Sequence, residues 1–128
     1  MADYTVKSID DMAGTFGGAF KLARAELGVT SFGMQVLDLP PDLKEGYPVH
    51  DHAEAGQEEV FIPLRGSGTM TIDGEAVDLA PGVALRVGPA AKRALVTGPE
   101  GLRLLALGGV PGEAYEINPQ TELSAIST

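Results

Sequence analysis

Cysteine and tryptophan are absent from this 128-residue sequence, and histidine occurs only twice. Without cysteine the chain has no disulfide, no thiolate nucleophile and no ligand for an iron–sulfur cluster, so a metal would need His or carboxylate ligands. Basic residues are also scarce, because 9 Lys and Arg face 18 Asp and Glu and leave a formal net charge of −9. Such a chain repels phosphate groups, which argues against nucleic acids and anionic membranes as partners. We expect a small molecule or a protein as the partner instead.

Long apolar runs are missing too. The sequence has no stretch of about eighteen uncharged apolar residues, and its N-terminus carries acidic residues and no apolar signal region. We therefore expect a soluble protein of the cytoplasm. The length fits one domain, and the 17 glycines and 9 prolines are spread along the chain, which is typical of an all-β fold with many turns. Within this domain we expect an N-terminal arm at 1–30, a body of strands at 31–109 and a packed C-terminal tail at 110–128.

Alternating apolar residues between turn signals predict the strands. A short helix is expected only within residues 20–28, where Gly28 stands at the place of a helix C-terminal glycine. Tight turns are expected at Arg65–Gly68, Asp73-Gly74 and Pro81-Gly82. The expected strands cover residues 31–39, 60–64, 69–72, 77–79, 83–87, 94–96 and 102–107.

The two histidines, His50 and His52, stand two positions apart, a spacing that places both side chains on one face of an extended strand. Glu59 follows in the next apolar segment and would bring a carboxylate to the same place from a neighbouring strand. Its neighbour Glu58 is expected to face solvent, because side chains alternate between the two faces of a strand. Two imidazoles and one carboxylate form a ligand set for a divalent transition metal such as Zn, Mn, Fe, Ni or Cu.

The pattern of His50-x-His52, then Glu59, then Gly66 after six further residues resembles the first motif of the cupins, which are small jelly-roll β-barrels. The sequence departs from that motif in having six residues between His52 and Glu59, where cupins have three or four. The resemblance covers most of the chain, from about Met34 to Gly109. It implies a single antiparallel jelly-roll β-barrel over residues 31–109. It also implies a homodimer, because similar cupins commonly pair through their sheet edges.

The second cupin motif matches residues 82–97 in spacing but hardly in identity. Arg93 stands where cupins have the His that serves as the fourth metal ligand, and Thr97 stands where they have Asn. A guanidinium is permanently charged and cannot ligate a metal. Ligand-binding roles are therefore expected for Arg93, for Tyr47 at the mouth of the site and for Phe61 in the pocket. For Phe61 the alternative of plain core packing is the more frequent one on strands of so small a barrel.

Three interpretations remain open. In the first, His50, His52 and Glu59 hold a divalent metal and the protein is a metal-dependent enzyme on a small molecule, of the oxygenase or isomerase type. In the second, Arg93 fills the vacated ligand position and pairs with Glu59, and a metal-free pocket binds a small polar or anionic molecule without catalysis. In the third, these residues only hold the fold together. The sequence does not decide whether the protein is an enzyme.

Overall fold

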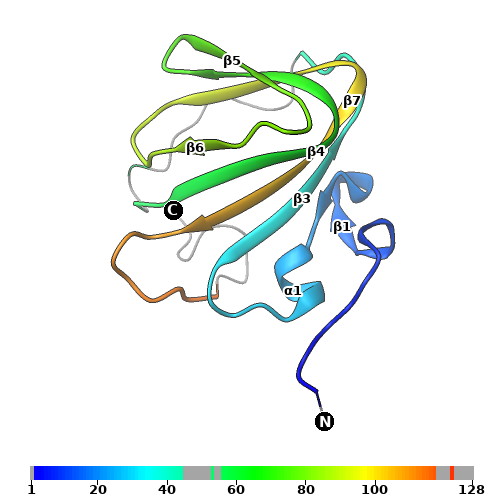
Figure 1. The fold of residues 1–128 in the computed structure, drawn as a ribbon, viewed down its shortest axis with the longest axis vertical. Helices are drawn as coiled ribbons and strands as arrows, with labels where there is room; N and C mark the ends of the chain where they lie inside the picture. Colours follow the sequence, from blue (N-terminus) through cyan, green and yellow to red (C-terminus); the bar gives the residue numbers. More distant parts are fainter. Residues whose placement is uncertain (1, 45–52, 54–55, 118–121, 123–128) are drawn as a thin grey trace.

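Antiparallel strands make up most of the regular structure in the computed structural model, which describes residues 2–44, 53, 56–117 and 122. The two long strands, β4 and β7, run side by side through the molecule, with β3 beside β7 (Figure 1). The strands are β1 (Gly14–Thr15), β2 (Phe20–Lys21), β3 (Gly33–Leu39), β4 (Glu58–Ile72), β5 (Glu75–Leu79), β6 (Leu85–Val87) and β7 (Arg93–Gly109). The helical segments are two single 3₁₀ turns, η1 (Ile9–Asp11) and η2 (Phe16–Gly18), and the short helix α1 (Ala23–Leu27).

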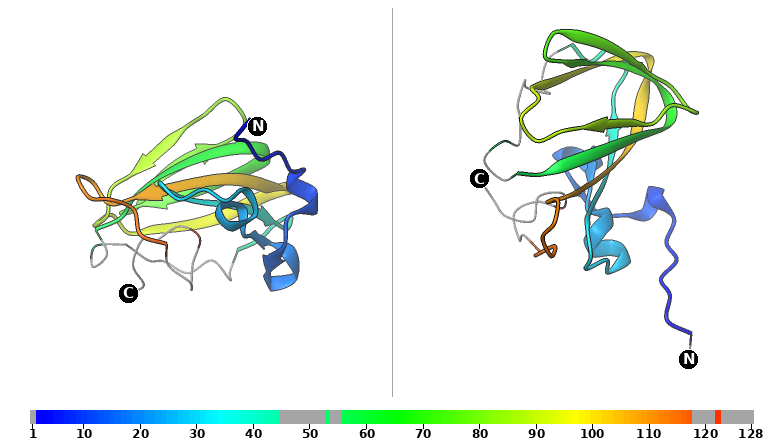
Figure 2. Two further views of the ribbon diagram at one scale, coloured as in Figure 1. Left: turned by 90° about the horizontal axis from the view of Figure 1, so that it is seen from below. Right: turned by 60° about the vertical axis from the view of Figure 1, so that its left-hand side comes forward.

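The strands form one sheet in the order β1-β2-β3-β7-β4-β5, with β6 also paired to β4. Every strand pair in it is antiparallel. The predicted all-β fold class is therefore confirmed. In one respect the sheet differs from the predicted barrel, because in the described residues no pairing joins β1 to β5 and the sheet is not closed. The sheet instead curls over on itself, as the two turned views show (Figure 2).

The curl comes from bends in β4 and β7. The predicted turn at Arg65–Gly68 is wrong, because β4 continues through it, and the predicted strands 94–96 and 102–107 are parts of one strand. The register between β4 and β7 shifts between Pro63 and Arg65 and again between Gly66 and Gly68. Gly66 has φ +81°, and a Cβ there would lie 2.1 Å from the carbonyl oxygen of Gly101. The glycines therefore form a bulge that bends two continuous strands rather than a turn that ends one.

The short turn and the short helix form where local sequence patterns predict them. The predicted turn at Asp73-Gly74 joins β4 to β5, with φ of 47° and 86° at its two residues, as a two-residue hairpin turn requires. The segment 20–28 contains strand β2 and then helix α1, which ends at Gly28 in the left-handed conformation with φ 77°. Glu122 caps this helix from the C-terminal part of the chain, since its carboxylate accepts hydrogen bonds from Arg24 and from the backbone N–H of Ala25, each at 3.0 Å.

The apolar side chains form two clusters on opposite faces of the sheet. The larger cluster fills the inner face of the curl, and the smaller lies on the outer face beneath α1 and the N-terminal segment. The inner cluster contains Leu37, Leu39, Phe61, Met70, Leu79, Val87, Leu95, Leu102, Leu104 and Ala106. The outer cluster contains Met12, Ala23 and Val36. In the described part of the chain, no helix is long and apolar enough to span a membrane.

Candidate functional site

The candidate site lies on the inner face of the curled sheet and joins the beginnings of β4 and β7. Glu59 is the second residue of β4, and its side chain points inward with 2% of it exposed. Arg93 is the first residue of β7 and is completely buried. Nη1 of Arg93 donates a hydrogen bond to Oε1 of Glu59 at 2.5 Å. Because Arg93 pairs in register with Ile72 at the other end of β4, its side chain reaches Glu59 across the interior of the curl.

Backbone carbonyls hold the rest of the Arg93 guanidinium. Nη2 donates to the carbonyl oxygens of Gly88 at 2.7 Å and Ala91 at 2.8 Å, and Nε donates to Ala91 at 3.2 Å. All three nitrogens of the guanidinium are thus engaged by the chain itself. The arginine therefore fixes the loop between β6 and β7 against Glu59, and most of its donors are not offered to a ligand.

Alternation along β4 places the neighbouring Glu58 on the other face, as the sequence predicts. Its carboxylate pairs with Arg86 on the adjacent strand β6, and the side chain of Arg86 is 64% exposed. Thr97, which stands at the last position of the second motif, is buried. Its hydroxyl donates to the carbonyl of Pro40 at 2.6 Å and accepts from the N–H of Leu43 at 2.7 Å. This threonine ties the chain after β3 to β7 and has a structural role.

In the first interpretation the carboxylate of Glu59 is a metal ligand, and in the structure this carboxylate accepts a hydrogen bond from Arg93. Arg93 offers no lone pair, and its positive charge would repel a divalent cation next to the same carboxylate. The described donors therefore do not fit a metal ion in their present arrangement. Within residues 2–44, 53, 56–117 and 122, no three His, Asp or Glu side chains gather into a metal-binding group.

Three of the predicted site residues, Tyr47, His50 and His52, lie outside the described residues. Their roles as ligands and as a cap on the site stay predictions. Phe61 is described and packs in the inner core with Met70, with 1% of its surface exposed. Its contact with a ligand also stays a prediction.

Gln57 belongs to this site although no motif singles it out in the sequence. It precedes Glu59 by two positions and is completely buried. Neither its Nε2 nor its Oε1 finds a hydrogen-bond partner among the described residues. Its side chain lies over Gly108, where an added Cβ would be 3.0 Å from Nε2 and 3.1 Å from Cδ. The alternation of side chains along a strand that predicts an inward Glu59 also predicts an inward Gln57. This alternation is the signal in the sequence that could have identified Gln57.

The fold has counterparts among solved structures. A crystal structure of a cupin protein from Bacteroides fragilis matches with a TM-score of 0.69 and 25% sequence identity, over 92% of this chain and 93% of that one. The chain is a cupin.

Two other similar proteins have names that state a function, one an isomerase and one a lyase. A sugar phosphate isomerase of the cupin superfamily from Silicibacter pomeroyi shares the fold, with a TM-score of 0.61 and 14% identity over 81% of this cupin and 74% of that chain. The dimethylsulfoniopropionate lyase DddW of Ruegeria pomeroyi is 35% identical over 77 residues, which are 60% of this cupin and 43% of the lyase. The matched region therefore spans less than half of the lyase. No model of a known protein family matches the chain.

Proposed function

We propose that this cupin binds a small, neutral, polar molecule on the inner face of its sheet, without a metal ion between Glu59 and Arg93. The observation that carries this proposal is the buried, unpartnered amide of Gln57. A buried amide without a partner costs about 1–3 kcal/mol, so a chain that keeps one loses stability for it. A ligand with a donor and an acceptor on the same carbon atom, such as a carboxamide, would satisfy both ends of the amide.

The charges of the site favour a neutral ligand over an anion. The formal charges of Glu59 and Arg93 cancel within one contact of 2.5 Å. The guanidinium nitrogens are also engaged by Gly88 and Ala91, which leaves little of the cation for an anion to bind. Moving an uncompensated anion into this apolar interior would cost more free energy than moving a neutral amide or hydroxyl group. Of the small polar or anionic ligands that the second interpretation includes, the polar ones fit better.

The substitution Gln57→Met tests this assignment without knowledge of the ligand. Methionine has a similar shape and needs no hydrogen-bond partner, so the variant should be about 1–3 kcal/mol more stable than wild type in urea unfolding. The control is Gln35→Met on β3, where the glutamine is partly exposed and the change should be within about 0.5 kcal/mol. A clear loss of stability in Gln57→Met would mean that the amide holds the fold together, and the proposal would fail.

A metal-dependent enzyme that cleaves a small molecule is the second candidate, and the match to the lyase DddW favours it. For this function Glu59 would have to exchange Arg93 for a metal. Zn²⁺, Mn²⁺ or Ni²⁺ should then bind to untagged wild type in calorimetric titration. Our proposal predicts weak binding that strengthens at least ten-fold in Arg93→His, because the substitution removes the repelling charge and adds a ligand. Tight binding to wild type, with no gain in the variant, would favour the enzyme.

We also propose that the protein is a homodimer. In the sheet order, β1 and β5 are end strands with one edge unpaired in the described residues, and such edges need cover. Several apolar side chains of the N-terminal segment, Tyr4, Val6 and Phe16, are at least 75% exposed and could provide it. Light scattering should give twice the chain mass of 13.3 kDa, and the mass of one chain at micromolar concentration would contradict the proposal.

A further inference from the structure

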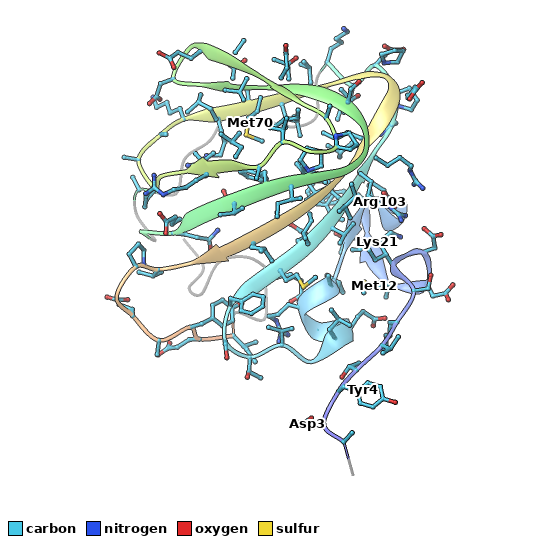
Figure 3. The ribbon with its side chains drawn as sticks, in the orientation of Figure 1. Asp3, Tyr4, Met12, Lys21, Met70 and Arg103 are labelled. Atoms are coloured by element: carbon cyan, nitrogen blue, oxygen red, sulfur yellow. The ribbon has the colours of Figure 1, made fainter. Side chains whose placement is uncertain are left out.

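A cavity lies on the opposite, outer side of the sheet, at the bend of β4 and β7. Its volume is about 530 Å³, within the range of small-molecule sites. Figure 3 shows Lys21 and Arg103 together on the side where the N-terminal segment runs, well apart from Met70 of the inner core. The cavity's charged lining residues are Lys21, Asp38, Arg65, Glu100 and Arg103, and its apolar lining includes Ala19 and Pro40.

Arg103 is already neutralised by the chain. Its Nε and Nη2 donate to the two carboxylate oxygens of Asp38 at 2.7 and 2.8 Å, and Nη2 also donates to Asp10 at 2.5 Å. These hydrogen bonds hold the pKa of both aspartates below the usual value, so both carboxylates are ionised at neutral pH. The carboxylates of Asp10 and Asp38 thus both bind the guanidinium of Arg103.

Lys21 borders the same cavity, and its ammonium group makes one long ion pair and no hydrogen bond among the described residues. Its side chain is 9% exposed, and its Nζ lies 3.7 Å from Oδ2 of Asp38, which is too long for a hydrogen bond. No described residue accepts a hydrogen bond from this ammonium group. A lysine so deeply buried normally has acceptors for its three donors. Its ammonium therefore has unused donors next to the cavity.

Arg65 adds a second cation to the lining of the cavity. It pairs in register with Arg103 across β4 and β7, and like charges directly opposite each other destabilise a sheet. Arg65 makes no ion pair among the described residues, and neither does Glu100 at the tip of the bend. The charged residues that line the cavity are three cations and two carboxylates, and Asp10, which binds Arg103 from outside the lining, brings the total charge to zero.

We propose that this outer cavity binds a small organic monoanion, a carboxylate with a short aliphatic chain. The carboxylate would lie between Lys21 and Arg65, and the short chain would pack against Ala19 and Pro40, which also line the cavity. The carboxylate would supply the hydrogen-bond acceptors that the ammonium group of Lys21 lacks among the described residues. A dianion such as phosphate would be repelled by Glu100 and has no apolar part for these walls.

Butyrate is the probe that tests this assignment. In a ¹H–¹⁵N spectrum at constant ionic strength, millimolar butyrate should shift the backbone amides of Gly18 and Leu102, which line the cavity. Butyramide, the neutral analogue, should leave them in place, and inorganic phosphate should bind at least ten-fold more weakly than butyrate. The proposal fails when butyrate moves neither amide, or when phosphate binds as well as butyrate.

Two variants link the signal to the cavity. Lys21→Met and Arg65→Gln should each weaken butyrate binding at least ten-fold. Arg65 is exposed, so its substitution leaves the fold intact even if the buried Lys21→Met variant unfolds. Lys92→Met is the control, because it removes the same charge from an exposed position that does not line the cavity. Equal weakening in all three variants would show a general effect of net charge and would overturn the proposal.

Discussion

Arginine–carboxylate contacts occur on both faces of the sheet, and the two groups differ in their charge balance. On the inner face Glu59 and Arg93 are both almost completely buried and neutralise each other. On the outer face Arg103 binds Asp38 at the edge of a cavity that also holds the partly neutralised Lys21. The inner pair needs internal compensation because both of its side chains are buried, whereas in the outer group the ammonium of Lys21 keeps unused hydrogen-bond donors beside a cavity. The same residue types thus favour a neutral ligand inside and an anion outside.

Removing one partner of the inner pair should have the largest effect. Arg93→Met leaves Glu59 buried without its cation, so the free energy of unfolding should fall by about 3–5 kcal/mol. The double variant Arg93→Met with Glu59→Leu removes both charges and should recover most of that loss. Arg86→Met on the exposed pair with Glu58 is the control and should cost about 1 kcal/mol or less. Urea unfolding of the four proteins measures this, and a loss below about 1 kcal/mol in Arg93→Met would contradict a buried ionic pair.

The outer group should lose part of its stabilising contribution in acid. Hydrogen bonds from Arg103 lower the pKa of Asp38 below 3.8 in the folded state. The contribution of Asp38 is therefore fully present above the unfolded pKa of 3.8, and it is lost as the pH falls below this value through the folded pKa.

Asp38→Asn should therefore flatten the dependence of unfolding free energy on pH below about pH 4, at a cost of about 1 kcal/mol or less at neutral pH. Unfolding measured from pH 5 to 2 checks the slope. An unchanged slope in the variant would show that Asp38 is not stabilised by Arg103. The matched substitution Asp42→Asn, at an exposed position after β3, should keep the wild-type slope.

A smaller effect is expected beside Gln57. The added methyl of Gly108→Ala comes within 3.0 Å of Nε2 of Gln57, so the end of that flexible side chain must move by a few tenths of an ångström. We expect a stability change of about 1 kcal/mol or less and a changed side-chain amide signal of Gln57 in the ¹H–¹⁵N spectrum. Gly109→Ala has open space at its Cβ and should leave that signal unchanged. Identical spectra for both variants would place Gln57 away from Gly108.

Local patterns in the sequence predicted only part of this structure. The turn at Asp73-Gly74 was predictable, because two successive residues there need positive φ, and alternation predicted that Glu59 faces inward and Glu58 outward. The bulge at Gly66 was not predictable, because glycines at these positions are compatible both with a turn that ends a strand and with a bulge that bends it. The close approach of Gly66 to Gly101 on the neighbouring long strand decides for the bulge.

Local sequence patterns also predicted only part of the candidate sites. A family motif drew attention to Arg93, and the structure shows the contact with Glu59 that the second interpretation requires. Gln57 carries no motif, and only the three-dimensional structure shows that its amide is buried without a partner. Lys21 and Arg65 come from segments 44 positions apart, and no local pattern relates them to one cavity.

The central claim is that the inner site takes a neutral polar ligand at Gln57, and butyramide tests it most directly. The measurement is the ¹H–¹⁵N signal of the Gln57 side-chain amide, assigned by its loss in Gln57→Met, during titration of wild-type protein with butyramide and, separately, with butyrate. We predict that butyramide at millimolar concentration shifts this signal and that butyrate leaves it in place. A shift with butyrate, or no shift with butyramide, would contradict the account.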